Sequence, residues 1–227
     1  MENFLKKRTL TIYWMVLLLH CVFQFYVLPY RAATKPFLVP LLLLHLMIND
    51  NNIGQPKGKS IFYIGMFLAF FGDVLLIIIN DTFFLSGMIA FMLMNLVYSA
   101  AFLCINQLQF KKILPFVFSI AMLSYLAYWF NGFLANEMGN YQMPILGYMI
   151  SLSIMISCAV NIIMKEKYRA IAITWLIPGT IVFLIENMLV ALNKFHWGGD
   201  KNVYVVIMFT YGLAQYLIVK GIRRIYL

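Results

Sequence analysis

Long apolar runs separated by short polar breaks dominate the pattern of this chain. A bilayer core of about 30 Å is crossed by roughly 20 helical residues, so apolar runs near that length predict membrane spans. The polar breaks have loop-like composition, and none is long enough to form a separate domain. The pattern predicts an all-α bundle, one integral-membrane domain over residues 1–227, with eight transmembrane helices at residues 9–28, 34–48, 60–79, 83–105, 113–130, 143–164, 169–192 and 203–222.

Composition supports a membrane protein and gives the expected orientation. The chain is 63% hydrophobic and 11% charged, whereas a soluble domain carries about 25% charged residues. With eight spans both termini lie on one side, and 13 of the 17 Lys and Arg residues fall on that side. Basic residues collect on the cytoplasmic side of membrane proteins, so both termini are predicted to be cytoplasmic. The net charge of +9 therefore reflects topology and predicts no nucleic-acid partner.

A weak internal sequence similarity relates the two halves of the chain. Gly65 precedes Asp73 by eight residues, and Gly179 precedes Asn187 by the same spacing, at an offset of 114 residues. Two parallel four-helix repeats would produce this offset. Chance matches between glycine-containing apolar helices are the alternative interpretation.

Two carboxyl groups lie inside the predicted spans. Of the eight acidic residues, Asp73 and Glu186 are intramembrane, while the others fall at helix ends or in loops. An ionisable group at such depth costs about 2.5–3.5 kcal/mol on insertion scales, so it usually faces the bundle interior and serves a function. The helical rise places both residues in the outer half at similar depth. They are the candidate catalytic residues.

Other polar side chains reach the same layer. Lys35, at the outer mouth of the second predicted helix, is placed to supply a cation for a carboxylate or a lipid phosphate. Further candidates for substrate binding or polar support are Asn95, Tyr98, Asn187, Tyr211 and Gln215, with Tyr148 nearby. Hydrogen bonding that holds helices together is the alternative for such residues. Neither intramembrane histidine has an HxxxH partner, so no metal or other cofactor is expected.

Several segments resemble a known family in their order and spacing. They are TKP at 34–36, GDVLLI at 72–77, FLSGMIAFMLMNLVYSAAF at 84–102, GTIVFLIENMLVALNKF at 179–195 and VIMFTYGLAQYLIV at 206–219. Together they resemble the YhhN-like lysoplasmalogenases. The resemblance implies a multi-span hydrolase that cleaves the vinyl ether bond of lysophospholipids, giving a fatty aldehyde and a glycerophospho-alcohol. It further implies contact with membrane lipids and location in a bacterial cytoplasmic membrane.

The chain departs from the family at two positions. The family has two candidate catalytic aspartates, of which the first matches Asp73, whereas the second position holds Asn187, next to Glu186. The family's usual histidine on the fourth helix is replaced by Asn95. Vinyl ether cleavage needs a protonated acid and a partner that stabilises a cation or activates water, by analogy with glycoside hydrolysis. Asp73 is the expected acid, and Glu186, helped by Asn187, is the expected partner.

Two other functions remain open from the residues alone. A non-catalytic lipid-binding or transport protein could keep the same scaffold without the second aspartate. A small-ion or proton transporter is a weaker alternative, because two intramembrane carboxyl groups form no obvious proton chain. The sequence leaves the oligomeric state open.

Overall fold

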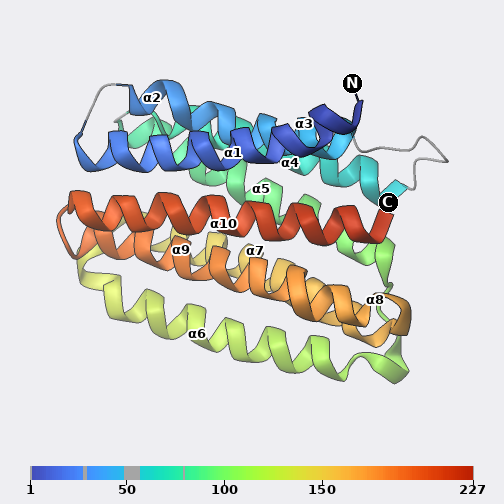
Figure 1. Cartoon of the computed structure of the whole chain (residues 1–227). Coiled ribbons are helices and arrows are strands. Elements are labelled where there is room, and N and C mark those ends of the chain that lie inside the picture. The colour runs from blue at the N-terminus through green and yellow to red at the C-terminus, as the bar shows by residue number, and fades with distance from the viewer. Residues whose placement is uncertain (1, 28–29, 49–56, 79, 227) are drawn as a thin grey trace.

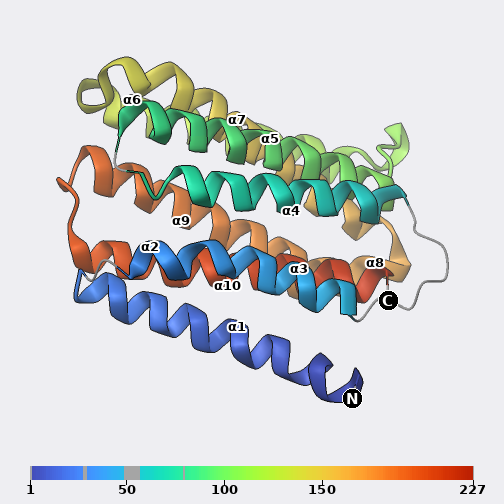
Figure 2. The same cartoon turned by 90° about the horizontal axis from the view of Figure 1, so that it is seen from above.

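Every regular element of the described chain is helical, which confirms the all-α prediction. The computed structural model describes residues 2–27, 30–48, 57–78 and 80–226. The helices lie roughly along one direction, and both chain termini lie at the same end of the bundle (Figures 1 and 2).

The structure has ten α-helices in its described residues, and their bounds differ from those of the predicted spans. Their bounds are α1 Glu2–Phe25, α2 Arg31–Thr34, α3 Leu38–Ile48, α4 Lys57–Leu75, α5 Asp81–Ile105, α6 Leu114–Met138, α7 Gln142–Asn161, α8 Glu166–Ile171, α9 Ile177–Phe195 and α10 Lys201–Tyr226.

Short turns of tighter or wider helix join several of these elements. Tight turns of 3₁₀ type are η1 Lys35–Phe37, η2 Phe110–Lys112, η3 Gly139–Tyr141 and η4 Ile162–Met164, and a π-turn, η5, covers Ala172–Leu176.

Two predicted boundaries need correction. The fifth predicted span stops at residue 130, but α6 continues to Met138 because Asn131 and Leu134 are buried within the bundle, and the helix passes through Gly132 without a break. Gly139 has a φ of +51°, a backbone conformation that glycine tolerates best, and the chain turns there. The third predicted span runs to residue 79, but α4 ends at Leu75. Hydropathy misses this end because the following turn is also apolar. Residue 79 itself and residue 28, the predicted end of the first span, lie outside the described residues.

The start of the second span also differs from the prediction. Residues 34–36 were expected to begin this helix, whereas α2 already begins at Arg31 and η1 joins it to α3. The proline ring fixes φ and removes a backbone donor, which suits Pro36 to a short turn of this kind. The turn has a functional consequence, because it is the element that carries Lys35 into the bundle.

Six helical segments in the described chain are long and apolar enough to cross a membrane, which supports an integral membrane protein. The segment Ala32–Ile48 is apolar but shorter. The six are Arg8–Phe25, Lys57–Leu75, Asp81–Ile105, Leu114–Met164, Glu166–Phe195 and Lys201–Tyr226. The fourth of them contains both α6 and α7, which fold back at η3 and lie alongside each other (Figures 1 and 2).

Close helix pairs build the bundle. α4 packs along α5 and α9 packs along α10, while α1 contacts α3 and α6 contacts α7. A glycine allows the close approach in each of the first two pairs. A Cβ atom on Gly65 would lie 2.5 Å from the ring of Tyr98, and one on Gly179 would lie 3.0 Å from the backbone nitrogen of Ile218. Small residues at such crossings are typical of membrane helix packing.

Candidate active site

A cavity of about 480 Å³ opens beside the end of α4, the start of α5, the end of α9 and the start of α10. It is enclosed by α4, α5, α7, α9 and α10, with η1 contributing one residue. Aromatic and aliphatic side chains form most of its wall. Its polar side chains are Lys35, Asp73, Asn80, Asp81, Tyr148, Glu186, Asn187, Lys194, Tyr204 and Tyr211. An apolar pocket with a few convergent polar groups is the usual form of a small-molecule site.

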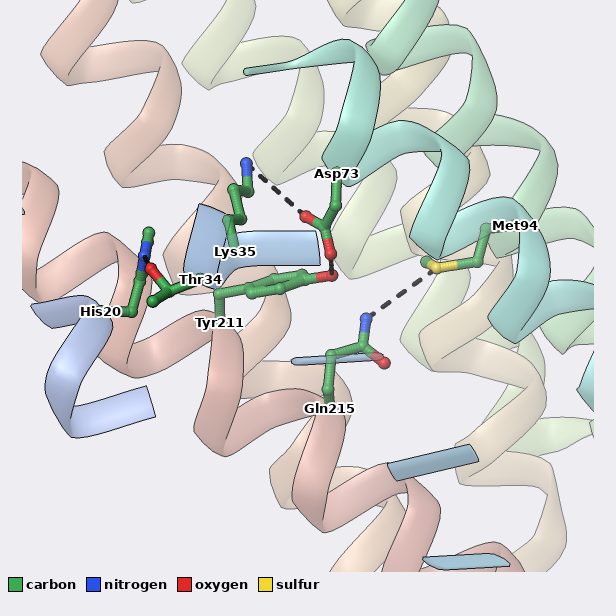
Figure 3. A network of polar contacts seen from close by, with 7 residues as sticks. All are labelled: His20, Thr34, Lys35, Asp73, Met94, Tyr211 and Gln215. Carbon is green, nitrogen blue, oxygen red and sulfur yellow. Dashed lines mark hydrogen bonds and ion pairs between the residues drawn. The ribbon is translucent and has the colours of Figure 1, made fainter. Parts of the chain in front are cut away.

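Asp73 lies in the last turn of α4 and is 1% exposed. The Tyr211 hydroxyl donates a hydrogen bond of 2.6 Å to its Oδ2 atom. The ammonium group of Lys35 lies 3.6 Å from its Oδ1 atom. Figure 3 shows both side chains pointing at the carboxyl group from different elements. The charge of a buried carboxylate here has both a cation and a hydrogen-bond donor to stabilise it.

The residue before Asp73 is a glycine for a steric reason. A Cβ atom on Gly72 would lie 2.7 Å from the ring of Phe91 on α5. Phe91 is buried, lines the cavity and packs edge to face against the Tyr211 ring, with 6.1 Å between ring centroids. Gly72 therefore allows the aromatic wall to approach the carboxyl group closely.

Glu186 has different surroundings from Asp73, although both line the same cavity. It is 5% exposed, and its Oε2 atom is buried with no hydrogen-bond partner among the described residues. A buried polar atom without a partner is costly in a folded protein. Because Glu186 also lines the cavity, it is a candidate functional residue. The cavity thus contains one paired carboxyl group and one unpaired carboxyl group.

Asn187 does not turn away from the cavity, but its amide is already bound. The Tyr148 hydroxyl donates a hydrogen bond of 2.6 Å to Oδ1 of Asn187. The amide nitrogen of Asn187 donates one of 2.7 Å to the Phe183 carbonyl, one turn earlier on α9. Both contacts fix the orientation of this side chain.

Three of the predicted site residues lie outside the cavity lining, in the packed core. Asn95 donates a hydrogen bond of 3.2 Å to Ser151, and Tyr98 stacks on the Phe62 ring at 4.4 Å between centroids. The amide of Gln215 points at the sulfur of Met94, 4.0 Å away (Figure 3). Asn95 and Gln215 therefore make polar contacts between helices, whereas Tyr98 joins α4 and α5 by ring stacking. The structure brings together the other five candidates, which are Lys35, Asp73, Glu186, Asn187 and Tyr211.

The mouth of the cavity contains charged residues that the sequence did not single out. The ammonium nitrogen of Lys194 lies 3.5 Å from Oδ1 of Asp81 and 4.2 Å from the centroid of the Phe84 ring. A signal for Lys194 existed in the sequence, since it follows Glu186 by about two helical turns and so lies near the same face of the helix. Asp81 was predicted to lie at a helix end or in a loop, outside the span at 83–105, whereas it belongs to the first turn of α5.

The two histidines within the predicted spans form hydrogen bonds. A ring nitrogen of His20 lies 2.7 Å from the Thr34 hydroxyl, next to Lys35 in Figure 3. The ring nitrogens of His45 lie near Thr9 and Arg223, at 2.9 and 3.1 Å. Within residues 2–27, 30–48, 57–78 and 80–226, no three His, Cys, Asp or Glu side chains gather in a way that could bind a metal ion.

Two buried carboxyl groups with unlike surroundings are suited to general acid and base chemistry. A cation and a hydroxyl donor contact the carboxyl group of Asp73, whereas Oε2 of Glu186 has no hydrogen-bond partner in the described part of the chain. Pairs of this kind divide the acid and base roles in many enzymes. The apolar remainder of the cavity wall suits a substrate with a hydrocarbon chain.

Comparison with known proteins identifies the family. The sequence model of the YhhN family matches residues 30–222, which include every residue of the cavity described above. No curated protein and no solved structure matches the chain. Because the match covers most of the chain and extends from the residue before α2 into α10, this protein belongs to the YhhN family.

Proposed function

We propose that this protein is a lysoplasmalogenase-like hydrolase that cleaves the vinyl ether bond of alkenyl lysophospholipids. The YhhN family, to which the chain belongs, includes lysoplasmalogenases. The observation that carries the proposal is the presence of paired Asp73 and unpaired Glu186 in one largely apolar cavity. The substrate is a single-chain phospholipid, and the surrounding membrane lipids supply it.

The reaction needs one proton donor and one water molecule. A proton added to the β-carbon of the vinyl ether produces an oxocarbenium ion, which water then attacks at the carbon bonded to oxygen. Loss of a proton gives a hemiacetal, whose collapse breaks the carbon–oxygen bond and releases a fatty aldehyde and the glycerophospho-alcohol. The net change is the addition of one water molecule across the ether bond, and the protonated acid is regenerated.

The surroundings of the two carboxyl groups favour Glu186 as the proton donor. Its Oε2 atom meets no hydrogen-bond donor in the described chain, so the side chain is best accommodated with its proton in place. Asp73 is held by Lys35 and Tyr211, which favour its ionised form. A carboxylate so placed stabilises the oxocarbenium ion and accepts a proton from the attacking water. This division of roles reverses the one expected from the sequence.

The mouth of the cavity provides the route for water. Asp81, which lines the mouth, has 80% of its side chain exposed. Glu186 and Asp73 lie deeper, with 5% and 1% of their surfaces exposed, so the carboxyl groups are shielded from bulk water while the mouth is open to it. Limited water access of this kind strengthens electrostatic stabilisation of the cation.

We infer that the bundle crosses the membrane eight times, with both termini cytoplasmic and two parallel four-helix halves. One of the six long segments, Leu114–Met164, contains α6 and α7, which fold back at η3 and so account for two crossings. The apolar segment Ala32–Ile48 adds one more, which gives eight crossings. Gly65 at the α4–α5 crossing and Gly179 at the α9–α10 crossing occupy corresponding places in the two halves. Single cysteines placed in each loop, labelled from one side of a vesicle, test this topology. Labelling that fails to alternate from loop to loop would contradict it.

A direct assay tests the proposed reaction. The purified protein, reconstituted in lipid, is given an alkenyl lysophosphatidylethanolamine, and release of fatty aldehyde is measured. The matched substrate control is the alkyl ether of the same chain length, which has no vinyl carbon to protonate. The variant control is Asp73→Asn, which should release no aldehyde. Absence of aldehyde from folded wild-type protein would exclude the hydrolase.

A non-catalytic lipid-binding or transport protein is the second candidate. The specific observation in its favour is that an amide, Asn187, receives the Tyr148 hydroxyl at the position where the family resemblance places an aspartate. This candidate predicts an inactive wild-type protein and activity in Asn187→Asp. Aldehyde release by the wild-type protein that Asp73→Asn removes would exclude it.

A further inference from the structure

Lys194 is a charged residue of the cavity that the proposed reaction does not use. It lies in the last turn of α9 and lines the same cavity as the two carboxyl groups. Its ammonium group is held between Asp81, at 3.5 Å, and the face of the Phe84 ring, at 4.2 Å from the centroid. The cation therefore lies at the mouth of the cavity, beside an exposed carboxylate.

The two lysines of the cavity differ in how fully their charge is neutralised. The carboxylate partner of Lys35 is 1% exposed, so separating that pair would leave a buried charge alone. The side chain of Asp81, the partner of Lys194, is 80% exposed. Ion pairs at such exposed positions contribute little to stability and exchange partners readily. Lys194 is thus the lysine in this lining whose charge is available to an anionic ligand.

The position of Lys194 along α9 matches the layout of a lysophospholipid. Residues 186, 190 and 194 follow each other at four-residue spacing, and all three line the cavity. The helical rise separates the first from the last by about 12 Å. In a lysophospholipid, a glycerol unit separates the ether oxygen from the phosphate. With the ether bond beside Glu186, the phosphate extends toward the mouth, where the flexible side chain of Lys194 can meet it.

We propose that Lys194 binds the phosphate group of the lipid at the cavity mouth, and that Asp81 is the counterion that the phosphate displaces. The inference rests on the proposed function for the identity of the lipid that carries the phosphate. Lysine is a common phosphate ligand because its ammonium group is a compact charge with three donors. Asp81 competes with the phosphate for this charge and so lowers the affinity.

Binding of an uncleavable ligand tests this proposal. The ligands are an alkyl-ether lysophosphatidylethanolamine, an alkylglycerol of the same chain without phosphate, and inorganic phosphate. The variants are Lys194→Met, Lys194→Arg and Asp81→Asn. The matched control is Lys201→Met, because Lys201 is exposed at the same end of the bundle and does not line the cavity. Dissociation constants are measured on the purified full chain in detergent.

The proposal predicts opposite effects for the two partners of the ion pair. Lys194→Met should weaken binding of the phospholipid roughly tenfold, as expected for one lost charge-assisted hydrogen bond, and leave the alkylglycerol unaffected. Lys194→Arg should retain binding. Asp81→Asn should tighten phospholipid binding because the competing anion is gone. Lys201→Met should behave like the wild-type protein.

Three outcomes would overturn the proposal. Equal affinity of Lys194→Met and wild-type protein for the phospholipid would exclude Lys194 as its ligand. Weaker binding of every lipid in both Lys194→Met and Asp81→Asn would make the pair a structural link between α5 and α9. Loss of inorganic phosphate binding alone would assign the residue to free phosphate. Since the alkyl ether is not cleaved, a missing aldehyde signal would count against hydrolysis and not against this subsite.

Discussion

The hydroxyl of Tyr211 lies 2.6 Å from Oδ2 of Asp73, although 138 residues separate them in the chain. The two residues belong to α10 and α4, so this hydrogen bond connects the two halves of the sequence at the cavity. Tyr211 is 3% exposed, and its ring packs between those of Phe91 and Phe183, with centroids 6.1 and 6.3 Å away. The aromatic wall therefore fixes the direction from which the hydroxyl meets the carboxyl group.

Tyr211→Phe removes this hydrogen bond and keeps the ring. A hydrogen bond to a charged group contributes about 1.5–3 kcal/mol, so we expect kcat for aldehyde release to fall roughly 10- to 100-fold. KM should change little, because Tyr211 acts on Asp73 as a positioning residue. Steady-state kinetics measure the split, and thermal unfolding checks that the variant is folded. A raised KM with unchanged kcat would show that Tyr211 contacts the substrate instead.

Lys35→Met should affect stability as well as activity. It leaves the Asp73 carboxylate buried without its cation, and loss of one partner of a buried ion pair costs about 3–5 kcal/mol. We expect a clear fall in Tm, measured in detergent. The double variant Lys35→Met/Asp73→Asn should recover much of the lost stability and remain inactive, because no charge is then left unpaired. A double variant no more stable than Lys35→Met would contradict this account of the pair.

The sequence allowed Asp73 and Lys35 to be predicted for a clear physical reason. A carboxyl group in an apolar span is costly, so it identifies an interior site, and the start of the second predicted helix offered a cation. The helix start at Thr34 was nevertheless wrong, since the proline-containing turn η1 is what brings Lys35 inward. The sequence left open whether Lys35 meets a carboxylate or a lipid phosphate, and the turn geometry that pairs it with Asp73 became visible only in three dimensions.

The positions of Asn95, Tyr98 and Gln215 show that depth along a helix does not by itself predict which side chains line the cavity. Rise per residue gives the position of a side chain along its helix, but the direction it faces depends on how the neighbouring helices pack. All three are nearly or fully buried, yet they contact α4, α5 and α7 side chains and not the cavity. Lys194 was not predicted as a site residue, because a lysine just beyond an apolar run has the pattern of an ordinary charged residue in a loop.

Glu186→Gln should lower the rate of aldehyde release without lowering the stability of the protein. The Oε2 atom of Glu186 has no hydrogen bond to lose, so the variant should keep a Tm close to that of the wild-type protein. Gln cannot donate a proton to carbon, and general acid catalysis contributes about 10²–10⁴-fold, so aldehyde release should fall by at least about 100-fold. Near-normal activity in a folded Glu186→Gln protein would assign the acid to another residue.

Gly179→Ala should weaken the helix pair that holds Glu186. The added Cβ atom would lie 2.9 Å from a side-chain carbon of Ile218 and 3.0 Å from its backbone nitrogen, and a backbone atom in a packed helix cannot move aside easily. Overpacking of this kind costs about 1–3 kcal/mol, so Tm should fall.

Gly132→Ala is the matched control, because a Cβ atom there meets nothing within 4 Å and alanine favours the helix. Since Gly179 lies about two turns before Glu186 on α9, we also expect aldehyde release to fall in Gly179→Ala and to persist in Gly132→Ala. Equal Tm values for the two variants would show that α9 and α10 can separate without cost, contrary to the close packing at Gly179.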